Sequence, residues 1–144
     1  MKVFKTVMLI TGIILLLLII IVFGFFGYMT SKVTALPEVS RFTGMIGKKN
    51  IGENYLFNDK SGNYIVLPGK KNNNVGIILY PAALADEKAY IPVAFKFADE
   101  GYSVFIAKMP LRLSMLNTEN GLNFIENFKD IKEWNIIGHS LGGL

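Results

Sequence analysis

Five consecutive residues, Gly138-His139-Ser140-Leu141-Gly142, have types and a spacing that suit covalent chemistry. They form a G-x-S-x-G pentapeptide, in which a serine hydroxyl is the attacking group. Such a serine needs a sharp, strained turn between a strand and a helix, so that its hydroxyl projects above the sheet. Bulky side chains would crowd that turn, which explains Gly138 and Gly142. The pattern predicts Ser140 as a catalytic nucleophile, with Gly138, His139 and Gly142 supporting the turn.

The residues around the pentapeptide predict the strand and the helix that this turn requires. Residues 133–137 are typical of a short buried strand that runs directly into the pentapeptide, and residues 141–144 can begin a helix. The first turn of a helix has free backbone N–H groups. We therefore expect the N–H of Leu141 to bind an oxyanion that develops on the attacked group. A pattern with three fixed positions also occurs by chance, so its meaning depends on this context.

His139 is the only histidine in the sequence and is therefore the first candidate for a general base. Adjacent residues on so tight a turn point in different directions, so its imidazole cannot readily reach the Ser140 hydroxyl. We expect His139 to support the turn or to pack beneath it. The base would then come from sequence outside these 144 residues.

Strands and helices are expected to alternate before the pentapeptide. Continuous apolar runs are typical of strands buried on both faces, and amphipathic or acid-started segments are typical of helices. Alternation of this kind predicts a parallel sheet with helices on its faces. The expected order is a strand at 75–80, a helix at 86–100, a strand at 102–107 and a helix at 118–129.

Two shorter β-rich runs precede this alternation. Residues 54–57 and 63–67 flank the turn-forming cluster 58–62, which predicts an antiparallel hairpin. A hairpin joined to a parallel sheet makes the sheet mixed. The predicted fold class is therefore α/β, with a mixed and mostly parallel sheet.

The N-terminal segment is apolar on every side. Residues 6–31 contain no charged side chain, and about 20 apolar residues suffice to cross a bilayer. A core helix would carry a polar stripe, which is missing here. A signal peptide has an apolar run of about 7–15 residues before small residues at its cleavage site. Residues 33–35 could form such a site, but the run is too long, so we expect an uncleaved anchor that contacts the membrane through residues 7–28.

Charge gives a weak orientation and excludes one class of partner. Lys2 and Lys5 precede the apolar segment, which favours a cytoplasmic N-terminus and an extracytoplasmic domain in a single-pass cell-membrane protein. Three of the 15 basic residues lie in the first 32 positions, which leaves 12 against 11 acidic residues in 33–144. A nucleic-acid-binding protein normally has a clustered basic face, so no nucleic-acid partner is expected.

Composition also excludes several kinds of chemistry. The sequence has no cysteine, which excludes disulfides, a thiolate zinc site and a cysteine nucleophile. No histidine or carboxylate cluster has the spacing of metal ligands, so no metal is expected. Neither the phosphate-binding G-x-x-x-x-G-K-[ST] pattern nor the dinucleotide-binding G-x-G-x-x-G pattern occurs.

The second half of the sequence resembles the α/β-hydrolase superfamily. It is most similar to a bacterial branch known as the dienelactone-hydrolase-like or "α/β hydrolase fold-5" group. The resemblance covers residues 75–144 and rests on four blocks in the family's order: 76–81, 86–90, 108–110 and 136–143. It implies a serine nucleophile, an acid and a histidine later in the chain, and hydrolysis of an ester, lactone or similar acyl bond without a cofactor.

The resemblance also implies a second oxyanion donor. In hydrolases of this architecture, the loop after the first buried strand supplies a backbone N–H. Pro81 has no N–H, so Ala82 or Ala83 must donate. Relatives commonly carry glycine after Tyr-Pro, whereas this sequence has Ala82-Ala83, which narrows the pocket slightly and keeps the N–H.

These observations predict three parts of the chain and one function. The parts are a membrane anchor or signal sequence at 1–32, a connector at 33–53 and a truncated α/β-hydrolase domain at 54–144. The expected function is a membrane-anchored serine hydrolase of a small acyl substrate, incomplete in these 144 residues. The alternatives are a non-catalytic hydrolase-like binding module and a fragment without function. Nothing in the sequence predicts an oligomeric state.

Overall fold

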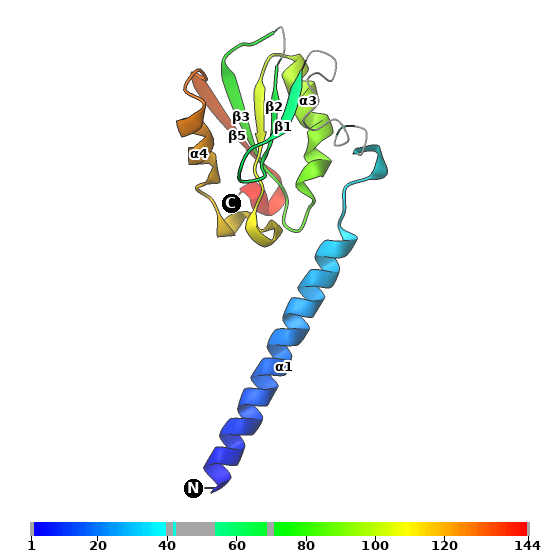
Figure 1. Cartoon of the computed structure of the whole chain (residues 1–144), viewed down its shortest axis with the longest axis vertical. Coiled ribbons are helices and arrows are strands. Elements are labelled where there is room, and N and C mark those ends of the chain that lie inside the picture. The colour runs from blue at the N-terminus through cyan, green and yellow to red at the C-terminus, as the bar shows by residue number, and fades with distance from the viewer. Residues whose placement is uncertain (1, 40–41, 43–53, 69–70, 144) are drawn as a thin grey trace. The chain divides into compact units, whose positions relative to one another are not determined.

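The computed structural model describes residues 2–39, 42, 54–68 and 71–143 (Figure 1). It separates into two compact units, residues 1–33 and residues 34–144. Most of the predicted connector lies outside the described residues. The elements, with η for a 3-10 helix, are α1 (Lys2–Lys32), η1 (Pro37–Val39), β1 (Tyr55–Asn58), β2 (Tyr64–Leu67), β3 (Val75–Tyr80), η2 (Glu87–Tyr90), α3 (Ile91–Asp99), β4 (Ser103–Ile106), η3 (Pro110–Arg112), η4 (Ser114–Leu116), α4 (Asn120–Asn127), β5 (Glu133–Gly138) and η5 (Ser140–Gly143).

The first unit consists of the helix α1. Its segment Val3–Ser31 is long and apolar enough to cross a membrane, by length and composition. No described residue of that segment is buried. A signal sequence near an N-terminus meets the same criterion, so the helix is compatible with either an anchor or a leader.

The second unit is built on one mixed sheet of five strands, in the order β1-β2-β4-β3-β5. β1 and β2 form the expected antiparallel hairpin, and β2 continues antiparallel onto β4. β3 lies parallel between β4 and β5 (Figure 1). The predicted fold class is confirmed: a mixed sheet with flanking helices in the second unit, and an apolar N-terminal helix in the first.

Each face of the sheet packs against a helix. Alternate residues of a strand point to opposite faces, so one buried strand supplies both packing layers. On β3, Ile77 and Leu79 pack in a cluster with Phe95 of α3. Ile78 of the same strand belongs to the other cluster, with Phe124 of α4. The domain is therefore built as helix, sheet and helix.

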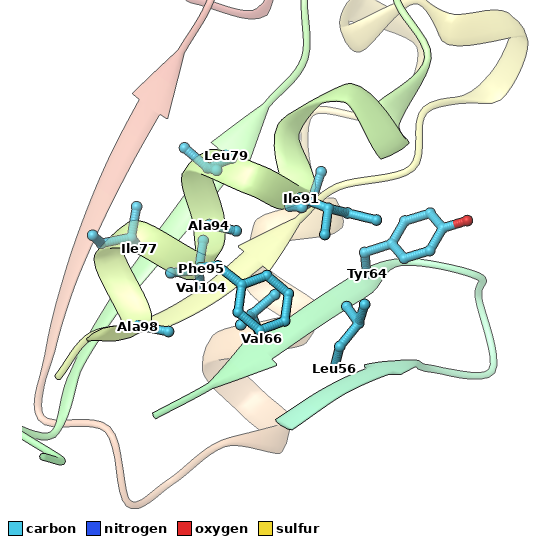
Figure 2. Packing of buried hydrophobic residues seen from close by; sticks show 11 residues of the cluster. Leu56, Tyr64, Val66, Ile77, Leu79, Ile91, Ala94, Phe95, Ala98 and Val104 are labelled. Carbon is cyan, nitrogen blue, oxygen red and sulfur yellow. The ribbon is translucent and has the colours of Figure 1, made fainter. Parts of the chain in front are cut away.

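The α3 layer has a small-residue helix face. Figure 2 shows Ala94 and Ala98 of α3 beside Phe95, with the helix lying close over the strands that carry Val66 and Val104. All five side chains are buried. Small side chains let the helix approach the β-branched residues of the sheet, so α3 packs closely on this face.

Two sequence expectations need correction. The segment 133–137 is a strand as predicted, but β5 is not buried, since Ile136 is 67% and Ile137 40% exposed. The reason is topological: β5 pairs with β3 on one side only, and no described residue pairs with its other side. The helix expected from residue 86 begins instead as the 3-10 turn η2, capped by the Asp86 side chain, before α3 continues it.

Candidate active site

Ser140 stands directly after the strand β5 and begins the 3-10 turn η5. Its backbone has a φ of +55°, in the left-handed region that residues with a side chain rarely adopt. The side chain is exposed. Strained backbone of this kind concentrates at functional sites, and a sharp strand-to-helix turn is what a G-x-S-x-G serine requires.

Close backbone packing explains the two glycines of the pentapeptide. A Cβ atom on Gly142 would lie 2.6 Å from the Pro81 carbonyl oxygen and closer still to that of Tyr80. A Cβ atom on Gly138 would meet the backbone of Gly142 and Gly143. Only residues without side chains fit these two positions, because the neighbouring atoms belong to the backbone and cannot rotate away.

The turn around Ser140 lies beside the loop that follows β3. β3 and β5 are parallel neighbours, with Tyr80 opposite Gly138 at their carboxyl ends. The backbone N–H of His139 donates to the Tyr80 carbonyl at 3.1 Å. The structure therefore brings the pentapeptide and residues 81–83 to the same edge of the sheet.

The backbone donors at this edge differ in availability. The Ala82 N–H donates to the Tyr90 hydroxyl at 2.8 Å. Among the described residues, no acceptor bonds the N–H of Ala83 or that of Leu141. Of the two alternatives that the sequence left open after Pro81, Ala83 is thus the donor whose N–H is unoccupied.

The His139 side chain is directed to Tyr90. Its Nδ1 lies 2.7 Å from the Tyr90 hydroxyl, and the two rings meet edge to face at 6.0 Å. No hydrogen bond joins its ring to the Ser140 hydroxyl within the described part of the chain. The imidazole thus faces Tyr90 at the end of η2, and the role of His139 as a support of the turn stays a prediction.

The comparisons with known proteins give one match. A family model described as "Alpha/beta hydrolase family" matches residues 76–144, from the second residue of β3 to the end of the chain. No curated protein matches this chain, and no solved structure does.

Residues 76–144 belong to the alpha/beta hydrolase family.

The family assignment, together with the mixed sheet, supports a hydrolase-like fold for this part of the chain and suggests hydrolase activity in general. The match covers the pentapeptide and the loop after β3. The roles predicted for Ser140, Leu141 and Ala83 are not tested by it. The structure gives the positions of these residues, and their roles remain predictions.

Three residues of the site were not predicted from the sequence. Tyr90 bonds both Ala82 and His139, and the Ser114 hydroxyl donates to the Leu141 carbonyl at 2.8 Å. The third, Arg112, fixes the loop after β3. These contacts span 8 to 49 residues along the chain and leave no local pattern. The signal available was indirect, since Tyr90 lies in one of the blocks on which the family resemblance rests.

Arg112 acts on the loop after β3 through three interactions. Its carbonyl accepts from the Leu84 N–H at 2.8 Å, and its Nη1 donates to the Leu84 carbonyl at 3.4 Å. Its Nη2 lies 3.9 Å from an Asp86 carboxylate oxygen. The loop that carries Ala83 is therefore held from the β4 side as well as from the pentapeptide.

A hollow of about 430 Å³ lies next to the pentapeptide. Its lining is mainly apolar: Tyr80, Ser114, Met115, Thr118, Ile136, Gly138, Leu141, Gly142 and Gly143. Neither Ser140 nor residues 81–83 line it. The hollow thus adjoins the turn on the side of Leu141, one of the two predicted N–H donors.

No group of three or more His, Cys, Asp or Glu side chains among the described residues could hold a metal ion. The chemical groups at the carboxyl edge of the sheet are a hydroxyl, backbone N–H groups, an imidazole and a phenol. Such a set supports attack on a carbonyl and stabilisation of the resulting negative charge.

Proposed function

We propose that this chain carries the nucleophile and the oxyanion donors of a membrane-tethered serine hydrolase, which cleaves an ester, lactone or similar acyl bond. The observation that supports this most is the backbone of Ser140: a side-chain-bearing residue held at a φ of +55° on an exposed turn. Such strain persists only where the surroundings enforce it. Here Gly138, Gly142 and the end of β3 enforce it.

In the proposed reaction the Ser140 oxygen attacks the carbonyl carbon of the substrate. Its proton passes to a general base, and the carbonyl π electrons move onto the oxygen. The N–H groups of Leu141 and Ala83 bind this oxyanion. Collapse of the intermediate expels the alcohol, which takes the proton, and leaves the acyl group on Ser140. Water then attacks the acyl-enzyme, releases the acid and restores the serine.

The general base is proposed to lie outside these 144 residues. His139 is the only histidine in the sequence, and its Nδ1 already bonds the Tyr90 hydroxyl. A serine without a base is a poor nucleophile. We therefore expect residues 1–144 alone to be inactive or nearly so, and the complete gene product to supply the histidine and its acid. No cofactor enters the proposed reaction.

A fluorophosphonate probe tests the nucleophile. It reacts with activated serines, so the protein made from the complete reading frame should be labelled in membranes. Ser140→Ala should abolish the label, a loss of more than about 100-fold, because the attacking atom is gone.

Ser61→Ala is the matched control. Ser61 is exposed on the β1–β2 turn, and its substitution should leave labelling unchanged. Labelling that persists in Ser140→Ala would contradict the assignment of the nucleophile. A folded wild-type protein that takes no label would instead favour a non-catalytic hydrolase-like binding module.

A further inference from the structure

We infer that Tyr90 is a positioning residue of this site: its hydroxyl ties the loop after β3 to the turn that carries Ser140. The inference rests on the proposed function, because it assigns a role in holding the two oxyanion donors. It concerns a residue outside the G-x-S-x-G pattern and outside the donors themselves.

One oxygen atom makes both contacts. The Tyr90 hydroxyl oxygen lies 2.8 Å from the Ala82 nitrogen and 2.7 Å from Nδ1 of His139. Ala82 precedes the proposed donor Ala83, and His139 precedes Ser140. A single phenol therefore spans the two segments that must face the same substrate oxygen.

The direction of each hydrogen bond follows from the donors present. A backbone N–H only donates, so the Tyr90 oxygen accepts from Ala82. The phenol proton is then free to be donated to Nδ1 of a neutral His139, whose own proton is on Nε2. The Ala82 N–H, the Tyr90 hydroxyl and Nδ1 of His139 then all have a hydrogen-bond partner. Because the Ala82 N–H is occupied, the next N–H along the loop, that of Ala83, is the one available to an oxyanion.

Tyr90 is itself held rigidly. It ends η2, whose first turn is capped by the Asp86 side chain accepting the Lys88 N–H at 3.0 Å. The next residue, Ile91, is fully buried at the start of α3. The ring packs half-buried against the α3 cluster. Because Tyr90 is anchored in this way, its hydroxyl links the core helix α3 to the loop after β3 and to the turn that carries Ser140.

Loss of this hydroxyl should slow the reaction more than it weakens substrate binding. An N–H that binds an oxyanion acts when charge develops, so its displacement lowers the maximal rate. Displacements of about 1 Å can cost up to about 100-fold in rate. Tyr90→Phe keeps the ring and its packing and removes only the tie.

The experiment measures fluorophosphonate labelling kinetics of the complete protein. Tyr90→Phe should lower the maximal labelling rate by about 10- to 100-fold and change the half-saturating probe concentration less than about 2-fold. His139→Leu should have a similar effect. The double variant should be no slower than the slower single variant, because both changes break one connection.

Tyr102→Phe is the control, since Tyr102 packs on the same cluster and stacks edge to face on Phe97. It should label at the wild-type rate. Hydrogen exchange of the same samples gives a readout that needs no activity: in Tyr90→Phe, peptides covering 81–85 and 136–143 should exchange faster, while 91–99 should not change.

Each outcome decides the inference. A wild-type labelling rate in Tyr90→Phe, additive effects in the double variant, or unchanged exchange in both loops overturns it. A wild-type protein without label refutes the proposed function instead. In that case, faster exchange in both loops still supports Tyr90 as the tie between them, and unchanged exchange rejects it.

Discussion

The backbone of Ser140 lies in the left-handed region, which costs a residue other than glycine about 1–2 kcal/mol. Its φ of +55° is maintained by contacts on both sides. The Gly142 N–H donates to the His139 carbonyl at 2.9 Å, and the His139 N–H donates to Tyr80. Backbone hydrogen bonds of the neighbouring residues thus hold the turn, while the Ser140 side chain itself is exposed.

Gly142→Ala should destabilise the fold, because the new Cβ would lie against the carbonyl oxygens of Tyr80 and Pro81. Backbone atoms at the end of a central strand cannot rotate away, so we expect a loss of about 1–3 kcal/mol and a loss of probe labelling. Urea denaturation, followed by tryptophan fluorescence of the complete protein in detergent, measures the stability.

Gly143→Ala provides the matched comparison one residue later. Apart from the adjacent backbone, the nearest neighbour of its Cβ would be the Gly138 carbonyl oxygen at 3.6 Å, which is an ordinary contact. The stability should stay within about 0.5 kcal/mol of wild type. Equal losses in the two variants would show that the turn tolerates no side chain at all, and would reject the packing explanation.

At the residue scale, the sequence predicted what a local pattern contains. The pentapeptide, the close packing of its two glycines and the prediction that His139 is not the base all follow from five adjacent residues. Tyr90 and Ser114 could not be found in this way, because their partners lie 49 and 27 residues further along the chain. Which of Ala82 and Ala83 has an unoccupied N–H depended on Tyr90 and was equally hidden.

At the scale of elements, a buried polar network fixes the loop after β4. Asn63, at the start of β2, is 1% exposed, and Asn120, at the start of α4, is 3% exposed. The Asn63 side-chain oxygen accepts from the Lys108 N–H at 2.8 Å and from Asn120 at 3.0 Å. Its amide donates to an Asp59 carboxylate oxygen at 2.7 Å. One asparagine thereby joins a hairpin turn, a loop and a helix.

Asn63→Ala should lower the free energy of unfolding by about 1–3 kcal/mol, because it removes the acceptor of the Lys108 N–H and one of the two acceptors of the buried Asn120 amide. Thermal melts followed by circular dichroism measure this. Asn123→Ala, on the exposed side of α4, should change the melting temperature little. A small effect of Asn63→Ala would mean that water replaces the lost partner and that the network is not a stabilising element.

The periodicity of the sequence predicted the elements well and their neighbours less well. Continuous apolar runs located β3 and β4, and the turn cluster located the hairpin. The pairing of β2 with β4 rather than β3 is a long-range choice that no local run encodes. The exposure of β5 was also missed, because a run such as Trp-Asn-Ile-Ile looks the same at the edge of a sheet as in its centre.

At the scale of the whole molecule, the apolar helix α1 and the hydrolase domain are separate units. The described side chains of α1 between Val3 and Gly24 are exposed, and the segment has a mean hydropathy of 3.2. A surface of this kind is unfavourable in water and suits a bilayer. The length of the apolar run favours retention over cleavage.

We predict that the mature protein keeps residues 1–32 and stays with membranes after carbonate extraction. Intact-mass measurement of the detergent-solubilised protein should give the mass of the uncleaved chain. Removal of residues 1–33 should release the protein into the soluble fraction, because it deletes the only described helix that could span a membrane. A mature N-terminus just after Ala35 would contradict the anchor and identify the segment as a leader.

Positive φ angles gather at the carboxyl edge of the sheet. Besides Ser140, they occur at Leu84 after β3 and at Leu111 and Arg112 after β4. Folded domains have a free energy of unfolding of only about 5–15 kcal/mol, so the backbone strain of four such residues is a sizeable fraction of it. Substitutions that raise the melting temperature of this protein are therefore expected at this edge of the sheet. Substitutions at the two leucines should be compatible with the proposed activity. Ser140→Gly should stabilise the fold in the same way but remove the proposed nucleophile, so the proposed function predicts a conflict between stability and activity at this one position.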